Sequence, residues 1–384
     1  MSTLQIIPIY HKVFLFYFKF PFLYDPATRR FKTDGGKDLI YSFYLAECVV
    51  ISCMVLAIIE VVNDIRYPEN IGVLEILLIV VALILTVFNV TSTIALSIVK
   101  NEFVAFYNDL ICQVELLDEV FAKRKPTKKL DKLTIILSIF IFLSAPMPLL
   151  FAIFCGYLTI HDSFAHLLYA WADAICPLNT YFACKSITFI VVTAYYGFVA
   201  FNDTAALVGG VINSAVIGNM LIDSVTKLAR LSPSLYSIQI YQRFRILAKN
   251  LEAISALVAS LLLSLGFGFT VTCNFVSVRM AGVIPMPFYL VFPIGSLLGM
   301  VGIRLLLPYG IACHENSSKL LVEWRTRLRL KRGNMRLEEK MGRMLIPIGI
   351  RVGSGEFSFF VLKKSTRSTY YMALMDYTVN ALMA

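Results

Sequence analysis

The chain has 384 residues, of which 58% are hydrophobic and only 16% are charged, and its mean hydropathy is +0.74. Soluble domains carry roughly 45–50% apolar and about 25% charged residues, so this composition excludes a soluble enzyme, a disordered chain and a small disulfide scaffold. The formal net charge of +10 fits basic loops on the cytoplasmic face of a membrane. From this composition we expect a polytopic membrane protein. We expect no nucleic-acid partner, because no basic cluster carries the polar, aromatic surface of a nucleic-acid platform.

Several segments are apolar over the roughly 20 residues that one bilayer crossing requires. They predict an all-α bundle of seven transmembrane helices, bent in the third at Pro146 and Pro148. The predicted spans, in chain order, are residues 39–62, 72–99, 133–160, 176–222, 251–276, 282–313 and 357–384. The last is the weakest by hydropathy, because three basic residues lie near its start.

Lysine and arginine alternate in number from one connection to the next. Residues 1–38 carry six, 100–132 seven, 203–250 five and 314–356 ten, whereas the other three connections carry two in all. Cytoplasmic loops hold the excess of basic residues. This pattern predicts a cytoplasmic N-terminus and, after seven crossings, an extracellular C-terminus in the plasma membrane.

The predicted topology divides the chain into four parts. They are a cytoplasmic N-terminal segment 1–38, the first six helices within 39–313, a cytoplasmic helical anchor 314–356 and the seventh helix 357–384. Segments 103–124 and 203–250 repeat apolar residues at helical spacing with charges between them. We expect them to be helical extensions that pack in an intracellular layer, the alternative being solvated loops.

Motifs for catalysis and metal binding are missing from the sequence. The four histidines are scattered and the eight cysteines lack metal-ligand spacing, so neither an enzyme nor a cofactor is predicted. Cys155 and Cys176 flank the outside connection after the third span, where a disulfide is conceivable. Cysteines within the spans, Cys184 among them, are interpreted as small buried hydrophobes. Lys185 either faces a cavity or an acidic partner, or snorkels from a helix that begins later than predicted.

The seventh span has two different faces. At helical spacing, one face carries Ser365, Thr369, Met372, Asp376 and Asn380. The opposite face carries Tyr370, Leu374, Tyr377 and Ala381. A polar stripe must be hidden from lipid, so we expect it to line a pore between several copies, where a ring of Asp376 carboxylates favours cations. The alternative is a helix inside the bundle with Asp376 paired to a lysine or arginine.

The same region resembles the insect gustatory receptor signature, which is Thr-Tyr, five mostly hydrophobic residues and Gln-Phe. Thr369-Tyr370 matches at the same spacing, whereas Asp376 stands in place of Gln and Tyr377 in place of Phe. Gly355-Glu356-Phe357 is similar to the Gly-x-Phe that opens the last helix of that family. Residues 24–31 are similar to the stretch before its first span.

The resemblance implies a ligand-gated, nonselective channel for monovalent and divalent cations, assembled as a homotetramer or with related subunits. In that family the seventh helices surround a central pore and the cytoplasmic helices form a shared anchor. A pocket for a small-molecule tastant opens from outside among the second, third, fourth and sixth spans. The candidate pocket residues, by depth and chemistry, are Tyr157, Trp171, Tyr181, Lys185, Tyr195 and Tyr196. Aromatic belts at the membrane interface would supply the same tyrosines.

Other functions remain open at this point. The nearest is an odorant-receptor subunit that needs a co-receptor. A transporter predicts internal repeats, and the two halves of the chain show no convincing one. A G-protein-coupled receptor also has seven spans, but its N-terminus lies outside and it usually carries Asp-Arg-Tyr-type and Asn-Pro-x-x-Tyr motifs, which are missing from the corresponding positions.

Overall fold

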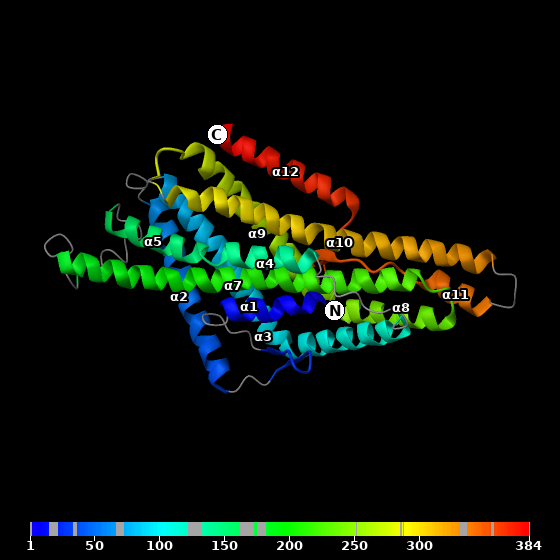
Figure 1. Ribbon diagram of the computed structural model, residues 1–384. Coiled ribbons are helices and arrows are strands. Elements are labelled where there is room, and N and C mark those ends of the chain that lie inside the picture. The colour runs from blue at the N-terminus through cyan, green and yellow to red at the C-terminus, as the bar shows by residue number, and fades with distance from the viewer. Residues whose placement is uncertain are drawn as a thin grey trace.

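Long helices that run side by side make up nearly the whole molecule in the computed structural model (Figure 1). The structure describes residues 2–14, 22–33, 37–66, 73–121, 132–161, 173–174, 182–250, 252–284, 286, 288–330, 336–354 and 357–383. The first helices are η1 (Ser2–Gln5), α1 (Ile6–Phe14), α2 (Lys37–Arg66), α3 (Val73–Phe121), α4 (Lys132–Ser144) and α5 (Met147–His161). After them come α7 (Phe182–Ala229), α8 (Leu235–Asn250), α9 (Glu252–Arg279), η3 (Phe288–Leu290), α10 (Val291–Leu330), α11 (Arg336–Met344) and α12 (Lys364–Met383).

Six helical segments among the described residues are long and apolar enough to cross a membrane. They are Phe43–Asn63, Ile79–Phe121, Lys132–Thr159, Ala183–Ala229, Glu252–Arg279 and Phe288–Leu330. Large apolar side chains on their outer surfaces are exposed, such as Ile139 at 53% and Phe142 at 63%, as expected where a helix faces lipid. The prediction of an all-α, multi-pass membrane protein is confirmed. The seventh predicted helix forms as α12, a 20-residue helix that is too polar to qualify by hydropathy.

Three helices are much longer than a membrane is thick. At 1.5 Å per residue, the 49 residues of α3 and 48 of α7 reach about 74 and 72 Å, against a hydrocarbon core of about 30 Å. The 40 residues of α10 reach about 60 Å by the same rise. The predicted extensions at 103–124 and in the first half of 203–250 therefore continue α3 and α7 without a loop. The only break in α3 is a non-helical residue at Val99.

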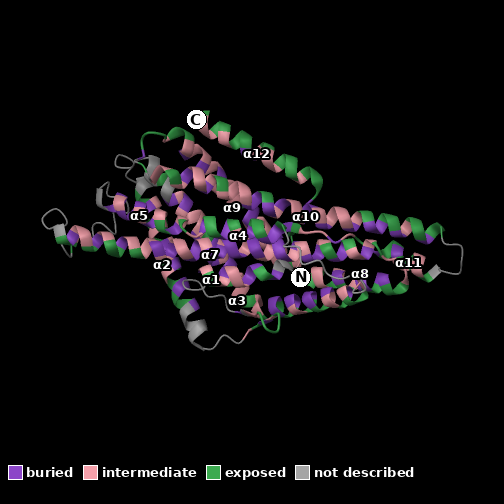
Figure 2. Cartoon of the chain, viewed as in Figure 1, coloured by how far each residue is buried: buried purple, intermediate pink, exposed green. Residues whose placement is uncertain are grey.

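The far halves of α3, α7 and α10 pack with α8 and α11 in what we call the extension layer. Its core holds fully buried aromatic residues, including Tyr107, Tyr241 and Trp324. The Tyr241 hydroxyl donates to the carbonyl of Ile346 at 3.0 Å, and the Tyr107 hydroxyl donates to Oδ1 of Asn213 at 3.1 Å. These segments form one packed core (Figure 2) rather than solvated loops.

A short hairpin at the N-terminus packs against the extension layer. Strands β1 (Leu23–Asp25) and β2 (Arg30–Lys32) are antiparallel and lie in the stretch that resembles the gustatory receptors. The side chain of Asn108 on α3 accepts from the backbone N–H of Phe31 at 2.9 Å and donates to its carbonyl at 3.0 Å. Arg30 pairs with Glu115 at 2.7 Å. This hairpin is thereby fixed to α3.

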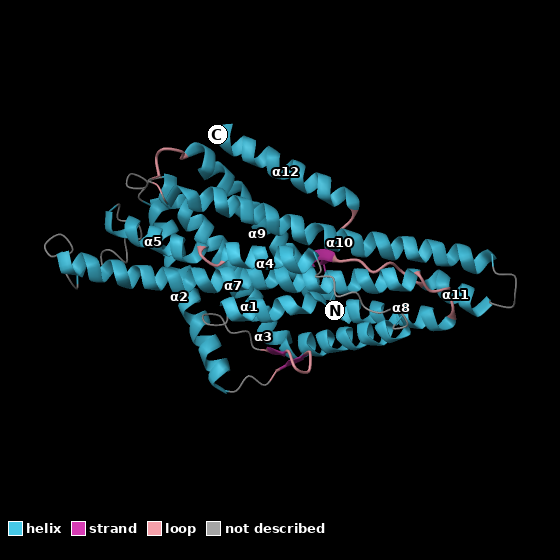
Figure 3. Cartoon of the chain, viewed as in Figure 1, coloured by secondary structure: helices cyan, strands magenta, loops and turns pink. Residues whose placement is uncertain are grey.

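The start of the seventh helix differs from the prediction. Residues Phe357–Val361 form strand β4, which pairs antiparallel with β3 (Arg351–Ser354), and the helix begins only at Lys364 (Figure 3). Aromatic and β-branched residues favour an extended chain. A Cβ at Gly353 would overlap the carbonyl oxygen of Phe357, so the strands need glycine there. Phe357 therefore lies in a strand and does not open the helix, and Gly355 lies outside the described residues.

Other predicted boundaries shift less. The third span breaks between α4 and α5 at residues 145–146, and the bend expected at Pro146 is confirmed. The sixth span was expected from residue 282 but begins at η3, because Gly282 adopts a φ of +84° in a turn. Among the described residues of the anchor segment 314–356, the helical ones belong to α10 and α11, residues 345–350 form neither helix nor strand, and Arg351–Ser354 form β3.

A close approach of α5 and α7 allows a stability prediction. A Cβ at Gly156 would overlap Oγ1 of Thr193 and lie 3.2 Å from the ring of Phe189. Gly156→Ala is expected to destabilise the fold by about 1–3 kcal/mol through overpacking, seen as a lower melting temperature of the purified protein in detergent. Adding Thr193→Ala should recover part of the loss, whereas Thr193→Ser keeps the oxygen and should not. Melting of Gly156→Ala at the wild-type temperature would contradict this packing.

Candidate functional site

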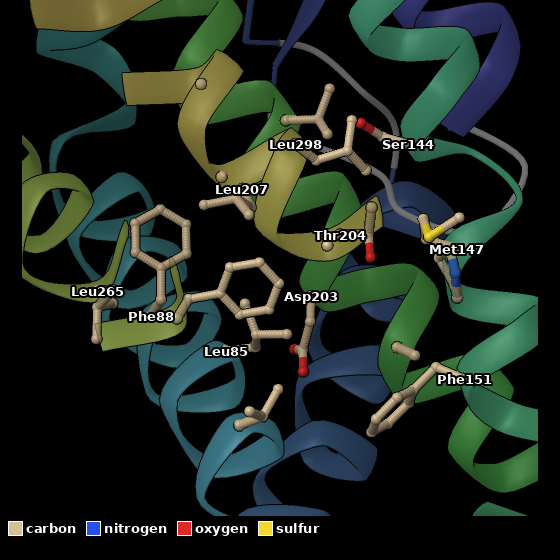
Figure 4. Close-up of a pocket in the computed structure, with 18 of the residues that line it drawn as sticks. Leu85, Phe88, Ser144, Met147, Phe151, Asp203, Thr204, Leu207, Leu265 and Leu298 are labelled. Carbon is tan, nitrogen blue, oxygen red and sulfur yellow. The ribbon is translucent and has the colours of Figure 1, made fainter. Parts of the chain in front are cut away.

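A cavity of about 150 Å³ lies inside the bundle, with walls from α2, α3, α4, α5, α7, α9 and α10. Its surface is almost entirely apolar, with Leu85, Phe88, Phe151, Leu207 and Leu298 among the side chains that line it (Figure 4). An apolar cavity of about this volume in an engineered protein accepts benzene. The cavity therefore has the size and surface to hold a small organic molecule.

One carboxyl group interrupts the apolar wall. Asp203 on α7 is only 3% exposed and lines the cavity (Figure 4). Its Oδ2 accepts from the hydroxyl of Thr86 at 3.0 Å and its Oδ1 accepts from the amide of Asn89 at 2.9 Å. Within the described part of the chain, no lysine, arginine or histidine forms an ion pair with it. An intramembrane carboxyl group is costly and marks a functional position by default.

A second buried carboxyl group lies on α2. Glu47 is 7% exposed, and its Oε1 has no hydrogen-bond partner among the described residues. The Asn89 amide that donates to Asp203 also accepts, through Oδ1, from the hydroxyl of Thr93 at 3.2 Å. Glu47 does not line the cavity, so Asp203 is the one carboxyl group among the described residues of its apolar wall. Such a site selects a small ligand with an apolar body and a hydrogen-bond donor at one end.

Helix α9 separates this cavity from α12. Leu262, Gly266 and Phe269 face the cavity. On an adjacent face of α9, the Tyr370 hydroxyl of α12 donates to the backbone carbonyl of Leu263 at 2.8 Å. The ring of Tyr377 meets that of Phe267 edge to face at 5.4 Å between centroids. A single helix therefore contacts both the cavity and α12.

The polar face of α12 points away from the rest of the chain. Its predicted stripe is exposed throughout: Ser365, Thr369, Met372, Asp376 and Asn380. On the opposite face Leu374 is buried, Tyr370 and Ala381 are half-buried, and Tyr377 packs on α9 while remaining exposed. Figure 2 shows α12 as a mostly exposed helix along the bundle. Asp376 has no basic partner in the described segments, so the alternative of an interior helix with a paired aspartate does not hold within one chain.

The candidate pocket tyrosines lie at different places around the bundle. Tyr196 lines the cavity. Tyr195, next to it on α7, instead places its hydroxyl 3.0 Å from Oγ of Ser52. The ring of Tyr157 stacks on Phe288 at 5.4 Å and is not among the lining residues. Depth in the membrane was therefore a poor guide to which aromatic side chain faces inward.

Two further candidates, Trp171 and Tyr181, lie outside the described residues. Lys185 lies in the first turn of α7, half-buried, and does not line this cavity. Asp203 was expected at the start of a cytoplasmic extension and was not predicted as a site residue. Its signal was an Asn-Asp-Thr run inside a helix that is otherwise apolar from residue 183 to beyond 215.

The cysteines also differ from expectation. Cys155 is a buried free thiol, so it does not form the disulfide that was conceivable with Cys176. Cys184 in the first turn of α7 is disulfide-bonded, although it was interpreted as a buried hydrophobe. The two residues are both near one end of the bundle, and depth alone did not distinguish them.

Comparisons with known proteins concern the fold. No family model matches the sequence, and no curated protein matches it. Among solved structures, the insect olfactory receptor OR5 from Machilis hrabei superposes with a TM-score of 0.69 at 12% identity, over 98% of this chain and 97% of the receptor. The same receptor in complex with eugenol gives a TM-score of 0.64 at 10% identity, over 99% and 98% of the two chains. The chain therefore has the fold of an insect olfactory receptor.

Proposed function

We propose that this chain is a chemosensory receptor that acts as a ligand-gated, nonselective cation channel. The observation that carries the proposal is the position of α9, which lines the cavity with one face and contacts α12 with the adjacent face. A ligand that enters the cavity pushes on Leu262, Gly266 and Phe269, and α9 passes the displacement to α12. The full-length fold match to an olfactory receptor supports this function.

The pore in this proposal lies between copies of the chain. The exposed polar stripe of α12 would be unfavourable in lipid, so it needs a partner surface or water. Several copies, as a homotetramer or with related subunits, surround an axis with Asp376 facing it. A ring of carboxylates attracts monovalent and divalent cations and repels anions.

The proposed topology puts the N-terminus and the extension layer in the cytoplasm of a cell and the C-terminus outside the plasma membrane. The excess of basic residues in the extension layer supports it. So does the disulfide at Cys184, because disulfides persist in oxidising compartments. In this orientation the first turn of α7 is on the extracellular side.

The proposed ligand is a small molecule with an apolar body and one hydrogen-bond donor. Asp203 already accepts from Thr86 and Asn89, and its remaining lone pairs are available to a hydroxyl or amine. Eugenol, which forms a complex with the similar olfactory receptor, is an aromatic molecule with a single phenol group. It is a suitable first probe.

The gustatory and odorant roles differ in whether the chain forms a channel alone or needs a second subunit. The Thr369-Tyr370 spacing favours a gustatory receptor for a tastant, whereas the fold match to an olfactory receptor favours an odorant-receptor subunit. The test is to express the chain alone, and then with other superfamily subunits, in cells without chemoreceptors, and to record currents from excised patches. Ligand-evoked current from the chain alone supports the gustatory role, and current only with a second subunit supports the odorant role. No current in either case would contradict a channel.

A further inference from the structure

A second cavity, of about 160 Å³, lies between the first cavity and the extension layer. Its walls come from α3, α7, α9 and α10. Three apolar side chains, Phe88, Leu262 and Leu306, line both cavities. Phe88 is only 1% exposed, and a Cβ at Gly210 would lie 3.5 Å from the tip of its ring. The two cavities are therefore neighbours separated by one layer of side chains.

The chemistry of the second cavity differs from that of the first. No aspartate, glutamate, lysine, arginine or histidine occurs among the described residues that line it. Several of its polar groups already have partners within the chain, whereas the hydroxyl of Ser214 is left for a ligand. Ser92 donates to the carbonyl of Asn89 at 3.0 Å, and Ser255 donates to that of Glu252 at 3.1 Å.

The side-chain amide of Asn213, which also lines this cavity, already forms hydrogen bonds within the chain. It donates to the carbonyl of Gly209 at 2.9 Å and accepts from the Tyr107 hydroxyl at 3.1 Å. A ligand in this cavity therefore gains chiefly from apolar contact. A charged molecule would lose its hydration without a compensating partner.

One wall of the second cavity leads directly to α12. Ile350 and Leu362 line it, and the N–H of Leu362 donates to the carbonyl of Ile350 at 3.0 Å. Leu362 is 4% exposed and packs against α10 where Gly310 leaves room, since a Cβ there would lie 2.5 Å from Cδ1 of Leu362. Leu362 is followed after one residue by Lys364, the first residue of α12. A molecule in this cavity thus contacts Leu362, the buried residue that holds the start of α12 against α10.

We propose that the second cavity is a separate binding site for a small, uncharged, apolar molecule, and that its occupancy restrains the start of α12. Binding follows from the cavity alone, whereas the effect on current rests on the proposed channel function. The first cavity, with Asp203, takes ligands that carry a donor. The second takes molecules that have none.

The test uses the detergent-purified full chain and a photoreactive probe without hydrogen-bond donors, 3-phenyl-3-(trifluoromethyl)diazirine. Illumination followed by peptide mapping should place label on lining residues such as Ile217 and Val258. Ala259→Phe, which projects a ring into the cavity from α9, should reduce that label about tenfold, the loss that about 1.4 kcal/mol of binding energy produces. Ala253→Phe, at an exposed position of the same helix, should leave it unchanged.

A second filling variant, Ser214→Leu on α7, keeps the test decisive if Ala259→Phe does not fold. Label that persists in a folded filling variant, or that is missing from the cavity peptides of the wild type, would overturn the proposal. Labelling is measured without recording a current, so it tests binding in the second cavity independently of the proposed channel function. If the channel function holds, the probe should alter ligand-evoked current in the wild type and not in the filled variant.

Discussion

Leu298→Trp is expected to abolish the current evoked by a ligand of the first cavity, or to raise its half-effective concentration more than tenfold. Leu298 projects into a cavity of only about 150 Å³ (Figure 4), and an indole ring there occupies the space a ligand needs. A tenfold loss corresponds to about 1.4 kcal/mol of binding energy, less than the burial of one large side chain contributes. Dose–response recording of surface-expressed protein is the measurement.

The neighbouring residue provides a matched control. Leu297 is 59% exposed on the outer side of α10, so Leu297→Trp adds the same indole to a surface that faces lipid. It should leave the dose–response curve unchanged. An equal response in wild type and Leu298→Trp, at equal surface expression, would place the ligand outside this cavity.

Asp376→Asn is expected to lower the permeability ratio of cations over anions by about tenfold, since each copy loses one unit of negative charge beside the ions. Asparagine has nearly the same shape, so α12 should keep its packing on α9 through Tyr370 and Tyr377. Reversal potentials measured in asymmetric salt report the ratio directly.

The control for this variant removes an exposed carboxylate elsewhere. Glu102 lies exposed on α3, whereas α12 packs chiefly against α9, and Glu102→Gln should leave the reversal potential as it is. If Asp376→Asn and Glu102→Gln behave alike, the stripe does not face the permeating ions.

Hydropathy and helical periodicity were sufficient to predict the membrane-spanning helices. They were insufficient to predict where some of these helices begin and end. The spans follow from long apolar runs, because burial in lipid depends on composition more than on order. Hydropathy could not show that α3 continues past Val99 for another 22 residues to Phe121. The amino-acid composition changes where a helix leaves the membrane, but the helical backbone continues. Hydropathy also extended the last helix back to residue 357, because Phe-Ser-Phe-Phe-Val is apolar enough for either a helix or a strand.

Residue-level prediction of the site was limited for a geometric reason. Tyr195 and Tyr196 have the same depth in α7, but consecutive residues in a helix point about 100° apart, and only Tyr196 lines the cavity. A helix that is apolar all round carries no amphipathic signal for its inward face. On α12 the predicted stripe is exposed, but Arg367, Met375 and Tyr377 outside the stripe are exposed as well, so the spacing predicted exposed positions without singling out one exposed face.

The position of α9 has a consequence for how such proteins diversify. Substitutions at Leu262 or Phe269 alter the shape of the cavity, whereas Leu263 and Phe267, one or two residues away, hold α12. The two sets of positions interleave along one helix but point in different directions. Substitutions that change the shape of the cavity are therefore expected to be possible on one face of α9 without loss of the contacts that hold α12 on the adjacent face.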